Sequence, residues 1–373
     1  MKKRPDYPIQ TGQEADAIMR AASDGKQGEH WRDVEQVAAH IFEVPGLSHS
    51  VRLRLTGDEE RAGLTLEALN ELRQMQDSDS AFALLFISRL MAEKQPTPDN
   101  PTTNIKVSLD EIITAIGLDP RTTTQRADYR RRVWAFIKFG ERAEIVGQRS
   151  APYFDKMNGQ QIETRLETAP WRIVEKVMAA QGSLFPDGDI PLRVELAPSA
   201  EWMKLLLNPS TAQFLPFGEA LGAIPSAKPS GAWARVVGLA LANFWRRFPR
   251  ETLEGTRHVT RRELLTHYPP RTGSVEELLN GTDPRRAVQY WAGALEILAG
   301  VGFLEKTGEA ALSYEEMRGT LEGYRWQEDW LNDFAILHPG EQMREALNAI
   351  ARGLPAPKPR DLKQPRKKRK NAN

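Results

Sequence analysis

The chain has 373 residues, which is enough for two or three domains, and its 40% hydrophobic and 27% charged residues are ordinary for a globular protein. It has no cysteine, which excludes disulfides, thiolate metal sites and cysteine nucleophiles and predicts a reducing, cytoplasmic location. No apolar run reaches the roughly 18 residues of a membrane-spanning helix, and the basic start runs into polar sequence rather than a secretory signal, so no membrane association is expected.

The formal net charge of +1 hides a strongly uneven distribution. Between Lys358 and Lys370 the tail carries eight cations and a single acid, Asp361, so the rest of the chain is net acidic. Such local cation density favours a partner that carries phosphate groups.

The first half of the chain is predicted to be mostly helical. An amphipathic helix is expected from Glu29 to Phe42, and another over residues 78–93, which prolines end. A strand over 105–107 then leads into a helix from Ser108 to Ile116, which Gly117 caps. A longer helix is expected from Thr123 to Phe139, ending at Gly140, and a strand over 144–149 begins a wing.

The second half repeats this order. A strand over 192–196 and a helix over 199–207 begin it, and an apolar helix spans 232–248. After an inserted loop, a helix is expected from Asp283 to Leu298, with Thr282 as its N-cap. Two short strands over 303–308 and 311–313 make a second wing. A helical segment over 314–352 and a disordered basic tail follow.

One short motif, V-[ST]-x-x-E-[IL]-[IL]-T, occurs twice, beginning at Val107 and at Val259. In each copy a hydroxyl residue precedes a glutamate by three positions, which is the capping box that opens a helix. Each copy is followed by an arginine-bearing stretch, a Trp-Ala pair and a glycine. Strand, capped helix, basic helix and hairpin are the order of elements in a winged helix.

The predicted fold is therefore mainly α with small β hairpins (α+β), built as two tandem winged-helix domains with helical N- and C-terminal additions. The predicted divisions are a helical N-terminal segment (1–60), winged-helix domain 1 (61–185), winged-helix domain 2 (186–313), a helical C-terminal extension (314–353) and a disordered basic tail (354–373).

Three groups of residues are candidates for contact with DNA, because arginine grips guanine and phosphate while hydroxyl and amide side chains contact bases or phosphates. The first helix and the strand after it offer Thr123, Thr124, Gln125, Arg126, Tyr129, Arg130, Arg131 and Arg149. The second unit offers Arg261, Arg262, Arg271, Arg285, Arg286 and Gln289. The tail offers Arg366, Lys367, Lys368, Arg369 and Lys370. The alternative interpretation of each group is a solvated surface, and Arg285 and Arg286 could pair with Glu276 and Glu277.

Enzymatic motifs are missing from the sequence. There is no G-x-x-x-x-G-K-[ST] segment for a P-loop, and the six histidines are scattered without metal-binding spacing, which also disfavours a metal-dependent nickase. The two D-x-D pairs lie in turn-like segments where aspartate is common. We therefore expect a protein that is not an enzyme and that needs no metal or cofactor.

Over residues 61–313 the motif and the order of elements resemble the theta-type plasmid replication initiators, the Rep proteins that bind repeated origin sequences called iterons. The resemblance implies two modules on one duplex, the second reading bases and the first contacting backbone and mediating dimerisation. It implies double-stranded origin DNA, a second copy of the chain and host replication proteins as partners. The segment before residue 61 and the addition after residue 313 depart from the family's pattern.

The sequence thus predicts a cytoplasmic, sequence-specific DNA-binding protein that initiates replication at repeated origin sites and represses its own promoter. A winged-helix transcriptional repressor would show similar residues. A non-enzymatic protein–protein adaptor, whose basic patches are only solvated faces, is the alternative of another class.

Overall fold

The computed structural model describes residues 9–10, 13–24, 30–34, 39–44, 49–54, 69–70, 72–73, 77–94, 103–148, 153–155, 160–162, 165–178, 190–207, 214–268, 270, 275–281, 283–305 and 326–352. Its helices are α1 (Gln13–Ser23), α4 (Asp79–Glu93), α5 (Leu109–Ala115), α6 (Thr123–Arg142), α7 (Ala200–Leu207), α8 (Gly218–Gly222), α9 (Pro229–Arg247), α10 (Pro249–Glu254), α11 (Arg261–His267), α12 (Val275–Leu279), α13 (Arg285–Gly300), α15 (Trp326–Asn332) and α16 (Glu341–Ala351). Its strands are β1 (Ile9–Gln10), β2 (Trp31–Val34), β3 (Ala39–Glu43), β4 (His49–Arg54), β5 (Ile105–Ser108), β6 (Ala143–Gln148), β7 (Tyr153–Asp155), β8 (Gln160–Ile162), β9 (Arg165–Thr168), β10 (Trp171–Val177), β11 (Arg193–Pro198), β12 (Phe214–Leu215), β13 (Val259–Thr260) and β14 (Phe334–Ala335).

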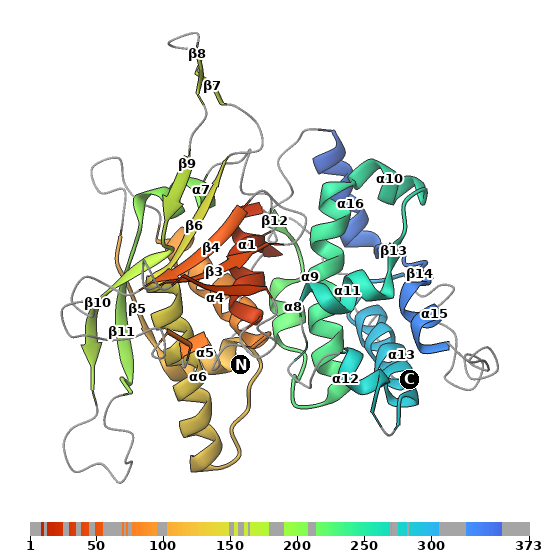
Figure 1. Cartoon of the computed structure of the whole chain (residues 1–373), viewed down its shortest axis with the longest axis horizontal. Helices are drawn as coiled ribbons and strands as arrows, with labels where there is room; N and C mark the ends of the chain where they lie inside the picture. Colours follow the sequence, from red (N-terminus) through yellow and green to blue (C-terminus); the bar gives the residue numbers. More distant parts are fainter. Residues whose placement is uncertain are drawn as a thin grey trace, which may run out of the picture.

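Figure 1 shows two groups of elements side by side, the first from α1 to β11 and the second from α9 to α16. The fold is mixed α+β, with helices packed on small antiparallel sheets. This agrees with the predicted class in its broad terms.

The first group contains a unit in the order α4, β5, α5, α6, β10 and β11, which we call the first unit. β11 lies between β10 and β5 and is antiparallel to both, with Val194 opposite Val107 and Leu196 opposite Ile105. These four side chains are buried because alternate residues of a strand point to the same face of its sheet. α4 packs against both α5 and α6, and α6 packs against β10.

A second sheet contacts this unit through α6, and of its strands the sequence predicted only the one over 144–149, which is β6. It has five antiparallel strands in the order β2-β3-β4-β6-β9, and β6 follows α6 directly in the chain. α1 packs against β4 and β6 of this sheet and also against α4. The N-terminal segment is therefore part of the first group and not a separate helical preface.

The second group contains α9, β13, α11, α13 and β14, which we call the second unit. β14 pairs with β13, with Val259 opposite Ala335, and Leu304 after α13 forms a bridge to Pro339. α9 packs against α11 and α13. Each unit thus begins with an apolar helix, followed by a strand, a short helix and a long helix.

Both copies of the repeated motif form the capping box that they predict. The Ser108 and Thr260 hydroxyls accept hydrogen bonds from the amides of Glu111 and Glu263, and each glutamate accepts one back from the N-cap amide. After α5, Gly117 has φ +74°, and a Cβ there would lie 2.3 Å from the Gly222 carbonyl oxygen. A glycine is required at this position both by conformation and by space.

Several local predictions are wrong. The predicted helix from Glu29 to Phe42 is instead the hairpin of β2 and β3, in which Trp31 lies opposite Phe42. Short apolar runs fit helical and strand periods alike, and pairing of β3 with β4 decides between them. Gly140 lies inside α6 and does not end it. A Cβ at this position would lie 2.1 Å from the Trp171 ring. Glycine here allows the helix to touch the ring.

The predicted divisions of the chain also need correction. The strand predicted to open the second domain is β11, which belongs to the sheet of the first unit, so a division at 185 separates β10 from its partner β11. Likewise β14, in the predicted C-terminal extension, completes the strand pairing of the second unit. The wing predicted over 303–313 lies outside the described residues beyond residue 305, and so do the cap at Thr282 and the tail.

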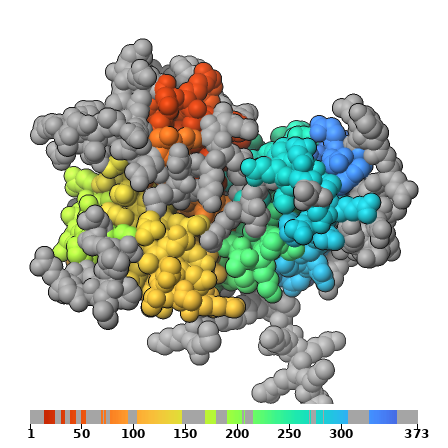
Figure 2. Space-filling model, turned by 60° about the horizontal axis from the view of Figure 1, so that its bottom comes forward, coloured from red at the N-terminus to blue at the C-terminus, as the bar shows by residue number. Residues whose placement is uncertain are grey.

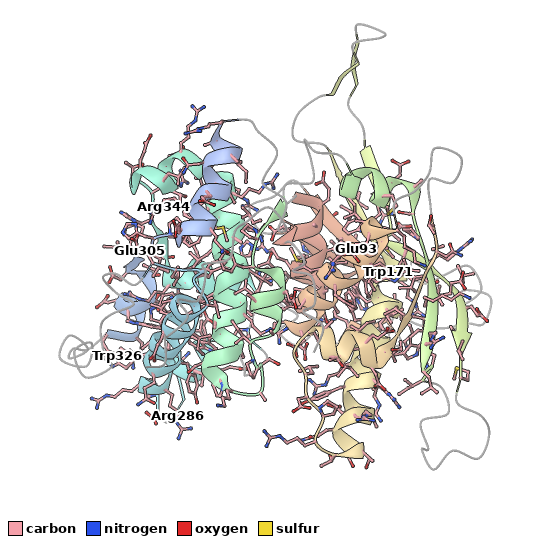
Figure 3. All side chains as sticks on the ribbon, turned by 180° about the vertical axis from the view of Figure 1, so that it is seen from behind. Glu93, Trp171, Arg286, Glu305, Trp326 and Arg344 are labelled. Atoms are coloured by element: carbon pink, nitrogen blue, oxygen red, sulfur yellow. The ribbon has the colours of Figure 1, made fainter. Side chains whose placement is uncertain are left out.

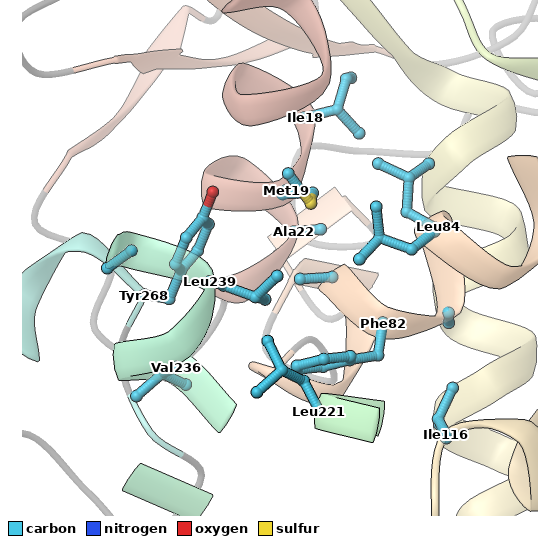
Figure 4. Packing of buried hydrophobic residues seen from close by; sticks show 14 of the residues in the cluster. Ile18, Met19, Ala22, Phe82, Leu84, Ile116, Leu221, Val236, Leu239 and Tyr268 are labelled. Atoms are coloured by element: carbon cyan, nitrogen blue, oxygen red, sulfur yellow. The ribbon is translucent and has the colours of Figure 1, made fainter. Parts of the chain in front are cut away.

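Buried apolar residues form a core cluster that runs through both units. Figure 4 shows Met19 of α1, Phe82 of α4, Leu221 of α8 and Leu239 of α9 within it. Because this core is continuous, the two units are held in contact by packing as well as by the chain that connects them.

Candidate nucleic-acid interface

The start of α6 presents a polar, positively charged surface. The N-cap Thr122 accepts a hydrogen bond from the Gln125 amide at 3.1 Å, and the Gln125 side chain accepts one from the Arg121 amide at 2.9 Å. The first bond satisfies an amide that the first turn of a helix leaves free, and the second holds the residue before the N-cap. Five of the predicted contact residues are exposed here, namely Thr123, Thr124, Gln125, Arg126 and Arg131.

Other predicted residues of α6 face the protein instead. Tyr129 is buried in the core. Arg130 donates two hydrogen bonds to Asp110 of α5, the first from Nε at 2.9 Å. This guanidinium lowers the pKa of Asp110. Arg130 therefore fixes α6 on α5, and Arg149 lies outside the described residues.

A neighbouring arginine that contributes to the basic run has the same structural character. Arg132 forms ion pairs with Asp77 at 2.9 Å and with Asp128 at 3.1 Å. Asp77 is buried at the start of the α4 region. The exposed arginines of α6 are thus Arg126 and Arg131, and the helix dipole also favours an anion at the first turn.

In the second unit, the matching surface is the first turn of α13. Arg285, Arg286 and Gln289 are exposed there. Arg286 forms a 3.0 Å ion pair with Asp283, in which both side chains are more than half exposed. Figure 3 shows Arg286 at the end of the molecule where α13 begins. Of the two acids considered as alternative partners of these arginines, Glu276 lies 3.3 Å from Arg262 instead.

Arg261 lies in the interior and presents no surface to a ligand. Its Nη1 donates to the Trp330 carbonyl oxygen at 2.9 Å and lies 3.2 Å from Asp333. The guanidinium also lies 5.9 Å and 5.4 Å from the ring centroids of Trp291 and Trp330. Because only 8% of the side chain is exposed, we leave Arg261 out of the interface.

Arg262 is partly exposed and joins two acidic side chains, Glu276 at 3.3 Å and Glu328 at 2.7 Å. It therefore links α11 to α12 and α15. Arg271 and the tail residues Arg366, Lys367, Lys368, Arg369 and Lys370 lie outside the described residues.

α6 and α13 begin at the same end of the molecule. In Figure 1 both helices start at the lower edge, and Figure 2, turned to show that edge, has the gold α6 and the cyan α13 region on one face with green segments between them. The two helix starts therefore lie at a common end of the molecule. A single elongated polyanion is the kind of ligand that could contact both.

Sequence reasoning missed the acidic partners that occupy part of the basic helix. Asp128 is four residues from Arg132 and could have been found from helical spacing. Asp110 and Asp77 are 20 and 55 residues from their partners, and no local pattern in the sequence connects them.

The described residues contain no group of three or more His, Cys, Asp or Glu side chains that could hold a metal ion. Among the helices that the structure describes, none is both long and apolar enough to cross a bilayer.

Comparisons with known proteins found only distant structural similarity to this chain. No family model matches it, and no curated protein matches it. A crystal structure of RctB domains 2-3 is similar over 79% of this chain and 85% of its own, with 12% identity and a TM-score of 0.42. A second RctB structure, of selenomethionine derivatives of domains 2 and 3, covers 76% and 86%, with 11% identity and a TM-score of 0.33. At these TM-scores the likeness transfers no function to this chain.

Proposed function

We propose that the chain is a sequence-specific double-stranded DNA-binding protein that uses two winged-helix units, with α6 and α13 as their recognition helices. The observation that carries this proposal is the placement of the two helix starts at one end of the molecule, because both starts have exposed glutamine and arginine side chains. Two repeated units with matching capping boxes support the assignment of α6 and α13 to the same role.

In this mechanism the two helices enter successive major grooves of one duplex. Arg126, Arg285 and Arg286 contact guanine or phosphate, and Gln289 contacts adenine. Arg130 and Arg132 keep α6 in place through their acidic partners, and Arg262 links α11 to α12, which packs against α13. The basic tail adds sequence-independent affinity by releasing counterions.

The biological role that we propose is replication initiation at repeated origin sites of a plasmid or similar element, together with repression of the protein's own promoter. Two reading helices on one protein suit a ligand with repeated sites. The protein acts without enzymatic chemistry, in the cytoplasm, as a monomer or homodimer that recruits host replication proteins. Repeated binding sites within a replication origin, rather than at promoters alone, distinguish this role from that of a transcriptional repressor.

The test is electrophoretic mobility across a salt series, with a duplex selected by the purified protein and a random duplex of equal length. We expect the selected duplex to bind more tightly at every salt concentration, and we expect both affinities to fall as salt rises. Arg286→Ala should weaken binding to the selected duplex. Arg344→Ala is its matched control, because Arg344 is a paired arginine near the upper edge in Figure 3 and Arg286 lies near the lower edge. Equal affinity for both duplexes would contradict the proposal and favour the adaptor hypothesis.

A further inference from the structure

Two buried carboxylates of the first group meet two arginines of the same helix in the second unit. Asp16 of α1 lies 2.9 Å from Arg247, and Asp79 of α4 lies 3.0 Å from Arg235. Both arginines belong to α9, and both carboxylates are almost fully buried, with 1% and 8% of their side chains exposed. These two ion pairs therefore join the first group of elements to α9 of the second unit.

Asp16 is the centre of the first contact. Besides Arg247, it accepts hydrogen bonds from the His267 ring at 3.0 Å and from the Tyr268 hydroxyl. The Tyr268 hydroxyl in turn accepts a hydrogen bond from Asn243 of α9 at 2.8 Å. Burial alone would raise the pKa of Asp16, but His267, Arg20 and Tyr268 hold it well below its ordinary value. The carboxylate is therefore ionised and engages both α9 and the end of α11.

Asp79 is the centre of the second contact. Its partner Arg235 is 1% exposed, and the guanidinium carbon lies 4.1 Å from the centroid of the Phe82 ring on α4. The Ser226 hydroxyl also donates to Asp79, at 3.4 Å. The first turn of α4 thus contacts α9 through one buried ion pair.

Buried ion pairs of this kind add little net stability, because the loss of hydration offsets most of the attraction. In some proteins such buried polar contacts instead select one register between packed elements. Arg235 and Arg247 are 12 residues apart, which is roughly 18 Å along an α-helix. Two such points fix the position of α9 along its axis as well as its rotation.

This arrangement connects the two proposed recognition helices. α6 packs against α4, α4 contacts α9 through Asp79, and α9 packs closely against α13. From this geometry we infer that Asp16 and Asp79 are positioning residues that hold α6 and α13 at one separation, so that the protein discriminates between DNA targets by the spacing of their two half-sites. The inference rests on the proposed DNA-binding function.

The variants for the test remove charge but preserve volume. Asp79→Leu is combined with Arg235→Met, since apolar residues of similar size commonly replace a buried ion pair without unfolding a protein. Asp16→Asn is made alone and is also added to these two substitutions. The triple variant, with Asp16→Asn, Asp79→Leu and Arg235→Met, is called the combined variant. Glu93→Gln is the matched control, because Glu93 lies on α4 like Asp79 but its ion pair with Arg89 is on the surface.

The first measurement is affinity for a series of duplexes in which two selected half-sites are separated by increasing numbers of base pairs. Each added pair rotates and displaces the second site, so the wild type should lose about 10-fold in affinity away from the optimal spacing. The combined variant should bind a single half-site as the wild type does, yet vary by less than about threefold across the series. A folded combined variant with the spacing preference of the wild type would overturn the inference.

The second measurement needs no DNA. Because the chain has no cysteine, spin labels can be placed at Thr124→Cys and Gln289→Cys. The distance between the two labels is then measured by pulsed electron paramagnetic resonance. The inference predicts one narrow distance distribution in the wild type and in the Glu93→Gln control, and a broad or shifted one in the combined variant. An unchanged distribution would overturn the inference even if the protein binds DNA, whereas failure to bind any duplex specifically would overturn the proposed function instead.

Discussion

The two units begin their short helices with the same capping box but stabilise their basic helices differently. In the first unit, arginines within α6 itself are held by acids, as in the Arg130–Asp110 pair. In the second unit, the anchoring arginines lie on the short helix α11, where Arg261 is buried against Trp330, and the arginines of α13 remain exposed. The number of arginines near a helix therefore does not measure the positively charged surface that the helix offers to DNA.

The largest expected effect tests this difference through stability. Arg261→Met should lower the free energy of unfolding by about 2–4 kcal/mol, because it removes the hydrogen bond to the Trp330 carbonyl and packing between two tryptophan rings. Arg285→Met should change it by less than about 0.5 kcal/mol, since Arg285 is exposed. Urea denaturation followed by tryptophan fluorescence measures both. Similar losses in the two variants would break the comparison.

The next effect tests the comparison through binding, with one arginine from each unit. Arg285→Ala should weaken binding to the selected duplex by roughly 1–3 kcal/mol and relax the preference at one base position. Arg130→Ala should weaken binding less selectively, because it loosens α6 on α5 rather than removing a contact. Fluorescence anisotropy on a set of single-base variants of the duplex separates the two outcomes. Equal losses on every duplex for Arg285→Ala would contradict its role.

A smaller effect asks whether the repeated motif contributes equally in both units. Ser108→Ala and Thr260→Ala should each cost about 1 kcal/mol, because each removes the side-chain half of a capping box. Thermal unfolding checks both values, with Thr256→Ala as a control at an exposed threonine outside the motif. A loss in only one unit would show that the boxes are not equivalent.

The smallest effect concerns pH and the junction of the units. Burial lowers the pKa of His267 below its ordinary value of 6.5, although Asp16 acts against this. The unfolded chain therefore binds a proton at His267 more readily than the folded chain, and stability should fall as the pH drops below 6.5. His267→Gln should lose less stability than the wild type between about pH 7 and about pH 5. Thermal melts across this range, with His258→Gln as a control at an exposed histidine, would contradict the account if both variants followed the wild type.

Local features of the fold could be predicted from the sequence. The two capping boxes and the helices that follow them depend on residues within one or two turns, and the structure contains them where Ser108 and Thr260 indicate. The five-stranded sheet could not be predicted, because its strands β4 and β6 are far apart in the chain and their pairing depends on tertiary register. Asp16 and Tyr268 are farther apart still, by 252 residues, so their hydrogen bond could not be predicted either.

The candidate site was predictable to a similar extent. The exposed threonines and arginines at the starts of α6 and α13 follow from helix periodicity and from the position of each N-terminus. Which arginines are engaged in the interior did not follow, since Arg261 and Arg262 look identical in the sequence. Only the packing of α15 against α11 distinguishes the buried arginine from the partly exposed one.

The central claim is that α6 and α13 contact one duplex together, and tethered DNA cleavage tests it most directly. A cleaving reagent attached in turn to Thr124→Cys and Gln289→Cys, in a chain without other cysteines, is mixed with one end-labelled, selected duplex. We predict two separate clusters of cuts, about one helical turn of DNA apart. Cuts from only one of the two positions, or cuts spread evenly along the duplex, would contradict the account.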